Sequence, residues 1–511
     1  MSGFTNLGKN GGGGSSAAQG SSGIGPFGTA MVSTPSPSAQ GAFIYAINNT
    51  QWTTSSTGIG SSVAALNAIL TCSSGNSLSG SAECRLTRGV KYRAGQGTMC
   101  RLTSIFDSGS PDTLQLAGAG NSECGYYFAR QGTSFGILHR QSSKVEVRSF
   151  SVSAQGSVTA VVNLGGNTVS VPIVGGSSAN QTSYQLSLAD YTKVGSGWVA
   201  ESIDGTIYFS SLIPGPIGGT FDITVSGISI VNSTSRVRAG ELPADTFISQ
   251  SSWNIDKFDG TGTSRVTLNP AKGNIYGVGF QYLGFGDSIF SIENPETGFL
   301  VDVHRIQNAN ARNSVVLSDP HVFAKWQVIN SGSQASSVSI KGASAGVFTE
   351  GVIARNIGPS FSSTGSISSV DTTLKPVLTI RANRLFGSNT CFGEIDIFNI
   401  SIGNDAGAST ANRLLKAFIY KNAQLGGPVN FQYVDQNRSF ASIDREATSL
   451  TVTPRTQLLK SIIVGANSSE ILYSSNENFF LTPGESLTIA VQSSKSTIDN
   501  AEISASWFED L

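Results

Sequence analysis

Charge is scarce in this chain of 511 residues. Asp, Glu, Lys and Arg make up 13% of it, about half of the roughly 25% usual for soluble globular proteins. The 32 basic and 33 acidic residues leave a net charge of −1, so the composition excludes a basic footprint for nucleic acid or for an anionic membrane. The clearest basic cluster, Arg236 and Arg238, is followed by Glu241 and is predicted to be solvated surface.

Metal-binding residue types are also few. The chain has three His and five Cys, without a CxxC pair, so no zinc site with clustered ligands is expected. Cys72 with Cys84, or Cys100 with Cys124, would suit disulfides in an oxidising medium. Buried free thiols, including that of Cys391, are the favoured interpretation.

Long apolar segments are missing. No run of eighteen apolar residues occurs, so no transmembrane helix is predicted. The first residues have neither a basic region nor an apolar core of the signal-peptide type. We therefore expect a protein made and folded in a cytoplasm, without membrane insertion.

In place of charge the chain has 59 Gly and abundant Ser, Thr and Asn, which favour turns over helices. Short apolar segments recur about every ten residues between turn residues, as in sandwiches and jelly rolls. We predict an all-β, multi-domain protein of β-sandwich or jelly-roll type, with a small inserted α+β module and an extended Gly/Ser-rich N-terminal arm. The expected parts are the arm (1–40), a β-rich domain (41–150 and 233–370), an inserted hairpin-helix-hairpin module (151–232) and a C-terminal β-sandwich (371–511).

Local signals place several elements. A helix is predicted for Ser61–Leu70, since a Ser precedes apolar residues at helical spacing. In the inserted module we expect a short helix within Asn180–Tyr191 and a hairpin that turns at Asp204 and Gly205. A turn at Pro483 and Gly484 should precede a regular strand.

The three histidines are the first candidates for catalysis. His139 and His304 each end an alternating strand and precede an Arg, and His321 follows a Pro. Asp302 lies two residues before His304, so regular alternation would place it on the same face, where it could orient the imidazole. No G-x-S-x-G elbow supplies a nucleophile. We therefore interpret the histidines as polar strand or interface residues.

Glu394 and Asp396 form the enzyme alternative. Two residues apart on a strand, their side chains would lie about 6.5–7 Å apart on one face, which overlaps the spacing of glycosidase carboxylates. Because the neighbours are Ile and Phe, the favoured interpretation is the exposed face of an amphipathic strand.

The remaining motifs are weak. The segment Asp256–Gly262 could hold a cation on a loop, although an ordinary turn explains it better. Gly-rich stretches lack the strand and helix context of a nucleotide site. We predict no catalytic, cofactor-binding or metal-binding residues, and no enzymatic activity.

Two stretches carry a resemblance. They run from Gly95 to Val152 (GQGTMCRLTSIFDSGSP…KVEVRSFSV) and from Ser249 to Ile306 (SQSSWNIDKFDGTG…GFLVDVHRI). Their pattern resembles structural proteins of large double-stranded DNA viruses and tailed phages. The module between them and the segment LTPGESLTIAVQSS are similar in kind to parts of phage tail and fibre proteins.

This resemblance implies a virion structural protein at the outer surface, such as a capsid vertex, minor capsid or decoration protein. Its partners would be copies of itself and other virion proteins. The alternative is a tail-fibre or spike protein that binds a host surface glycan through residues 371–511. A polysaccharide-degrading enzyme using Glu394 is the third hypothesis.

Overall fold

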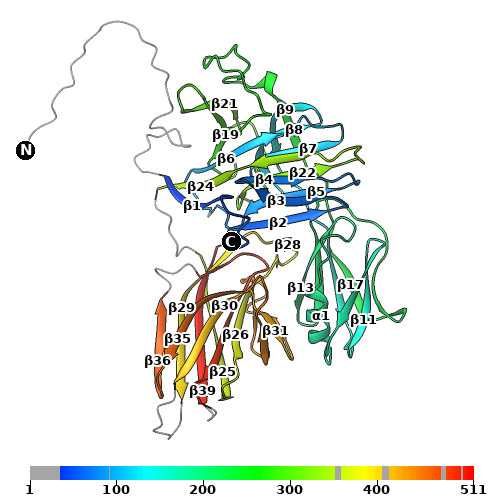
Figure 1. The fold of residues 1–511 in the computed structure, drawn as a ribbon, viewed down its shortest axis with the longest axis vertical. Coiled ribbons are helices and arrows are strands. Elements are labelled where there is room, and N and C mark those ends of the chain that lie inside the picture. The colour runs from blue at the N-terminus through cyan, green and yellow to red at the C-terminus, as the bar shows by residue number, and fades with distance from the viewer. Residues whose placement is uncertain are drawn as a thin grey trace, which may run out of the picture.

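The computed structural model describes residues 35–90, 92–351, 358–405, 414–473, 479–495 and 499–510. Most of the expected N-terminal arm lies outside these residues, and only its end, residues 35–40, falls within strand β1 (Pro35–Ala42). The described chain is nearly all β, which confirms the predicted fold class. It forms three bodies, named below the N-terminal sandwich, the inserted module and the C-terminal sandwich (Figure 1).

The N-terminal sandwich consists of β1–β9 and β18–β24, so its chain is interrupted by the inserted module. Its first sheet has nine strands. Seven of them run in the order β21 (Leu300–Ile306), β20 (Ser288–Glu293), β19 (Asn274–Phe280), β6 (Thr98–Phe106), β23 (Ser339–Gly342), β4 (Ile69–Ser73) and β3 (Ser62–Leu66); β24 (Ser344–Glu350) pairs with β6, and β1 pairs with β24.

The second sheet of this sandwich has seven antiparallel strands. They are β18 (Asp245–Ser249), β9 (Ser134–Arg140), β8 (Gly125–Gln131), β7 (Thr113–Gly120), β22 (Phe323–Asn330), β5 (Ser81–Leu86) and β2 (Trp52–Thr57). A 3-10 turn, η1 (Gln250–Ser252), follows β18. Alternation along β2, β5 and β22 sends Trp52, Cys84 and Trp326 into the core between the sheets and polar residues to the outer face.

The inserted module packs two four-stranded sheets and α1 (Ala179–Ser187) around a core of its own. Ser178 caps the helix by accepting a hydrogen bond from the Gln181 amide. One sheet runs β13 (Trp198–Ile203), β14 (Thr206–Ser211), β10 (Val147–Val152), β17 (Val231–Arg238), and the other β12 (Asn167–Ile173), β11 (Val158–Leu164), β15 (Phe221–Val225), β16 (Ile228–Ser229). The sequence placed this module at 151–232; its sheets span Val147 to Arg238.

The C-terminal sandwich also packs two sheets, of five and six strands, around one core. The first contains β25 (Ser360–Val370), β39 (Asp499–Asp510), β29 (Glu394–Asp405) and β36 (Ser468–Tyr473), with β37 (Phe480–Leu481) on β29. The second runs β32 (Gln432–Tyr433), β33 (Ala441–Asp444), β26 (Lys375–Ala382), β38 (Ser486–Ser493), β30 (Leu415–Lys421), β35 (Gln457–Val464). Two short ribbons are β27 (Leu385–Phe386) with β28 (Asn389–Thr390), and β31 (Gln424–Gly426) with β34 (Ser449–Thr451).

Local predictions differ in outcome. The predicted helix at Ser61–Leu70 is wrong: this segment is the hairpin β3–β4, which turns at Asn67 (φ 52°) and Ala68 (φ 62°). A ten-residue helix is marginal by itself, and pairing of β4 with β23 favours the strand. The helix within 180–191 is confirmed by α1.

The two predicted turns are confirmed. Asp204 (φ 46°) and Gly205 (φ 69°) close the hairpin β13–β14, with the positive dihedrals that a two-residue turn of this hand requires. Gly484 (φ 92°) precedes β38.

Candidate functional site

His139 is a buried structural residue. Its Nε2 lies 2.7 Å from the carbonyl oxygen of Val316, and its ring stacks on Tyr126 with centroids 4.8 Å apart. Burial lowers its pKa, and the nearby Arg312 lowers it further. These contacts match the predicted polar role within a sheet.

The expected partnership of Asp302 with His304 is wrong. The register of β20 and β21 shifts, so that His304 opposes Phe290 while Asp302 opposes Ser291. Because consecutive residues of β20 face opposite sides, the two side chains lie on opposite faces. The Ser291 hydroxyl donates to Asp302 (2.7 Å), and the Asn254 amide donates to Nδ1 of His304 (3.2 Å).

Glu394 and Asp396 are not on an exposed face, which corrects the sequence interpretation. Glu394 is buried, and Arg88 of the N-terminal sandwich binds it with both Nη2–Oε1 (2.5 Å) and Nε–Oε2 (3.0 Å). The same Nη2 lies 3.9 Å from Asp396 Oδ1. The guanidinium thus joins both acids across the boundary between the two sandwiches. It occupies the space between the two carboxylates in which a glycosidase would hold a sugar.

The segment Asp256–Gly262 forms turns. Asp256 is buried and accepts hydrogen bonds from the amides of Phe258 (2.9 Å) and Ser264 (2.7 Å). Asp259 accepts from Thr261 in the same manner. Within the described residues no group of three or more His, Cys, Asp or Glu side chains could hold a metal ion.

The five cysteines are free and buried, as the favoured sequence interpretation predicted. Burial raises the pKa of Cys100 to about 12 and that of Cys124 to about 11. Thiols of this kind are poor nucleophiles at neutral pH.

The basic cluster is only partly solvated. Arg236 binds the buried Glu146 through two bonds of 2.8 Å. Arg238 binds Glu123 (2.7 and 2.6 Å) and donates to the Thr390 hydroxyl (2.7 Å). The prediction of solvated surface is therefore wrong for Arg238, whose side chain is 9% exposed and joins all three bodies.

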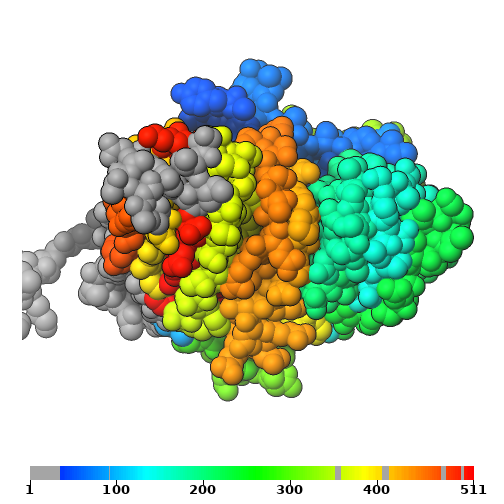
Figure 2. Space-filling view, turned by 90° about the horizontal axis from the view of Figure 1, so that it is seen from below, coloured from blue at the N-terminus to red at the C-terminus, as the bar shows by residue number. Residues whose placement is uncertain are grey.

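Further polar contacts fix the inserted module to the C-terminal sandwich. Arg381 donates to the Ser202 carbonyl (2.7 Å), and its guanidinium lies 3.8 Å above the Phe431 ring. The Leu425 amide donates to the Tyr184 hydroxyl (2.9 Å). Seen from below, the two bodies lie directly side by side (Figure 2).

Replacing Arg381 should loosen this boundary. In Arg381→Met the Ser202 carbonyl loses a charged donor and Phe431 its cation, so we expect a loss of about 1.5–3 kcal/mol. Differential scanning calorimetry should then show the inserted module unfolding earlier and separately. Arg438→Met is the control, because the Arg438 side chain is 82% exposed and pairs with Asp435 of the same body. A single unshifted transition in Arg381→Met would contradict the expectation.

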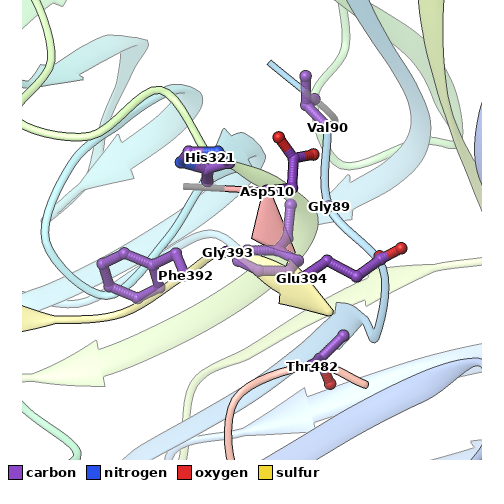
Figure 3. Close-up of a pocket in the computed structure, with 9 residues that line it drawn as sticks. Gly89, Val90, His321, Phe392, Gly393, Glu394, Thr482 and Asp510 are labelled. Atoms are coloured by element: carbon purple, nitrogen blue, oxygen red, sulfur yellow. The ribbon is translucent and has the colours of Figure 1, made fainter. Parts of the chain in front are cut away.

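A small cavity of about 10 Å³ lies where the two sandwiches meet. Figure 3 shows His321 and Asp510 beside Glu394 around it. Nδ1 of His321 lies 2.8 Å from Asp319 Oδ1. Burial opposes the charge on the imidazole, but the hydrogen bond and charge of Asp319, with Asp510, prevail and raise its pKa.

His321 should therefore stabilise the protein more in acid than in base. A histidine whose pKa is higher in the folded than in the unfolded protein stabilises the fold while it is protonated. This contribution is fully present below the unfolded pKa, near 6.5, and is lost as the pH rises through the folded pKa. His321→Asn should lose more free energy of unfolding below about pH 6 than above about pH 8. Urea titrations at both pH values measure this, and the opposite order would refute it. His304→Asn is the control, because burial lowers the pKa of His304.

A second, much larger cleft lies where all three bodies meet, with a volume of about 770 Å³. Its floor is the outer face of β2, β5 and β22, from which Thr53, Glu83, Arg85 and Gln327 project. The inserted module adds Ser210 and neighbouring residues, and the C-terminal sandwich adds a wall that contains Arg384, Lys421, Arg455 and Glu485. We name this space the junction cleft.

Acids of the junction cleft are already engaged. Lys325 donates to Glu83 (2.8 Å) from a position with 1% side-chain exposure. Lys421 binds Glu485 (2.8 Å). Arg85 lies 3.7 Å from Glu83 and stacks over Phe323.

Sequence reasoning did not find the junction cleft. Its residues come from segments more than three hundred positions apart, and no chemical motif links them, although Pro483 and Glu485 adjoin the predicted turn. The one local signal is the polar alternation in TQWTTSST, SAECRL and FAKWQVIN, which exposes a hydroxyl- and charge-bearing face.

Comparisons with known proteins give the following. No protein-family model matches the chain, and no curated protein matches it. Among solved structures, a protein of unknown function from Shewanella oneidensis is 9% identical, covers 64% of this chain and 92% of its own, and has a TM-score of 0.25. Peanut lectin with a 9-residue peptide is 9% identical (62% and 99% covered, TM-score 0.23), and lectin II from Ulex europaeus is 10% identical (62% and 100%, TM-score 0.20). Identities and scores this low assign no function to the chain.

The described part of the chain has no helix with the length and apolar character for crossing a membrane.

Proposed function

We propose that the chain is a non-catalytic structural subunit of the outer surface of a virus particle, made in the host cytoplasm and assembled with copies of itself and other particle proteins. The observation that carries the self-assembly is an open side of the C-terminal sandwich. There β35 and β36 lie together, and among the described residues β35 pairs only with β30 and β36 only with β29.

The side chains on these two strands support association. Leu458 and Ile463 on β35 are 50% and 60% exposed, and Ile471 and Tyr473 on β36 are 50% and 66% exposed. An open strand edge that also presents apolar side chains is a template for pairing with another chain. We name this surface the β35/β36 edge.

Fixed domain positions also support a structural role. Ion pairs and charged hydrogen bonds of Arg88, Arg238 and Arg381 cross each boundary between the three bodies. Such contacts hold a subunit in one shape, so that identical copies can pack in the same way. They also pair charged side chains that a catalytic site would need unpaired. The virus assignment itself rests on the resemblance of the sequence.

The β35/β36 edge can be tested with charge. Ile463→Lys combined with Ile471→Lys should convert an oligomer of the full chain to a monomer in analytical ultracentrifugation, with an unchanged circular dichroism spectrum. Leu242→Lys is the control, since Leu242 is 72% exposed on a loop elsewhere. A parent chain that stays monomeric at all concentrations would overturn the proposed self-assembly. The virus assignment is tested separately, by the position of the protein in an electron-microscopy map of intact particles.

The junction cleft favours a second function, attachment to a host surface glycan. Its size is within the usual range of about 300–1,000 Å³ for ligand sites, and its lining is rich in hydroxyl and amide groups. Because three bodies build it, a glycan array must use the full chain; residues 371–511 alone lack the floor.

A further inference from the structure

The cations of the junction cleft exceed its acids. Two carboxylates, Glu83 and Glu485, face the four cations Arg85, Arg384, Lys421 and Arg455. Four minus two leaves an excess of two positive charges. Lys325, just beneath the floor, further neutralises Glu83.

Two of these arginines have no counter-ion in contact. Within the described residues the guanidinium groups of Arg384 and Arg455 make no ion pair and no hydrogen bond. Arg384 does lie in the fields of Glu201 and Glu485, and Arg455 lies in that of Asp190, yet burial prevails over its acids and lowers the pKa of Arg384. The charge of Arg455 repels it as well. Arg384 is half-buried and Arg455 is exposed. A half-buried cation without a direct partner is unfavourable, and an anion in the cleft would relieve it.

The backbone holds Arg384 in this position. Its amide donates to Glu201 of the inserted module (2.9 Å). Its guanidinium packs on Gly484, where an added Cβ would lie 2.2 Å from Nη2. The turn at Gly484 thus makes room for the side chain, so the geometry is preformed.

The rest of the lining suits a saccharide. Around the arginines stand hydroxyl and amide side chains of the N-terminal sandwich and of the C-terminal wall itself, among them Asn49, Thr53, Ser55, Gln327, Asn422 and Gln457. Such groups donate to and accept from sugar hydroxyls. Guanidinium groups bind carboxylate, sulfate or phosphate oxygens in pairs.

We propose that the junction cleft binds an acidic saccharide, whose carboxylate, sulfate or phosphate group lies between Arg384 and Arg455. This deepens the second proposed function, glycan attachment, and rests on it. Arg85, already stacked on Phe323 at 4.1 Å, provides the inner positive end of the site. The floor contacts the neutral sugar positions.

Isothermal titration calorimetry on the full chain tests this with matched probes. They are sialyllactose against lactose, a sulfated disaccharide against its unsulfated form, and inorganic sulfate and phosphate. We expect each acidic saccharide to bind at least about tenfold more tightly than its neutral match, with affinity that falls as salt rises. Arg384→Gln and, separately, Arg455→Gln should each weaken acidic binding by about tenfold. Arg438→Gln, 82% exposed elsewhere on the C-terminal sandwich, should leave it unchanged.

The outcomes separate the two levels of the proposal. Equal binding of acidic and neutral saccharides would overturn the acidic class and leave glycan attachment standing. No binding of any saccharide at millimolar concentration would overturn both. Inorganic sulfate or phosphate that binds as tightly as the saccharides would overturn the saccharide assignment. If Arg384→Gln fails to fold, the exposed Arg455→Gln decides.

Discussion

Lys325→Met is expected to lower the free energy of unfolding of the N-terminal sandwich by about 3–5 kcal/mol. The Nζ of Lys325 donates to Glu83 (2.8 Å) and to the Asn121 carbonyl (3.1 Å). Lys325 and Arg85 keep the pKa of Glu83 below its ordinary value despite burial. Without Lys325, the carboxylate keeps Arg85 at 3.7 Å and the more weakly acting Arg140 as compensating cations among the described residues.

A double variant separates the charge from the packing. Lys325→Met with Glu83→Gln removes the uncompensated charge and should recover part of the loss. Urea unfolding followed by tryptophan fluorescence measures both. A change within about 0.5 kcal/mol in the single variant would contradict the role of the pair.

Trp326→Ala is expected to destabilise the same sandwich by about 3–5 kcal/mol. The indole is fully buried, its Nε1 donates to the Thr103 carbonyl (3.0 Å), and its ring lies 5.7–5.8 Å from Trp52 and Phe43. Gly342 lies directly against it, since a Cβ there would be 2.4 Å from the indole. The cavity left by alanine is therefore enclosed on every side.

Two further variants test this packing by thermal unfolding. Trp326→Phe should lose less than the alanine variant, because part of the ring volume is kept. Phe299→Ala, at a 71% exposed position, is the control and should barely change the melting temperature. A loss in Trp326→Ala no greater than that of Phe299→Ala would contradict the expectation.

The sequence predicted those parts of the fold that depend on local chemistry. Asp204 and Gly205 have the dihedral freedom for a tight turn, and Ser178 begins a helix that its own side chain caps. At Ser61–Leu70 local chemistry misled, because β23, more than 250 residues away, supplies the strand partner of β4. The local residue pattern carries no information about a partner strand that lies far away in the sequence.

The candidate site was less predictable for the same reason. Glu394 appears exposed from its strand pattern, yet Arg88 from another body buries it. A bulge of one residue separates Asp302 from His304, and alternation alone cannot show a bulge. Arg384 and Arg455 lie in no recognisable sequence motif. They line one cleft only because the three bodies pack together.

The interrupted N-terminal sandwich has a consequence for synthesis. Strand β22 lies between β5 and β7, but Lys325 leaves the ribosome 242 residues after Glu83. Translation proceeds at about 5–20 residues per second, so the edges of β5 and β7 that later pair with β22 stay unpaired for on the order of 10–50 s. The inserted module, whose strands are contiguous from β10 to β17, can fold during that interval. Nascent-chain release at residue 320 should therefore yield a folded module beside an open half sandwich, which closes once β22, β23 and β24 have been added.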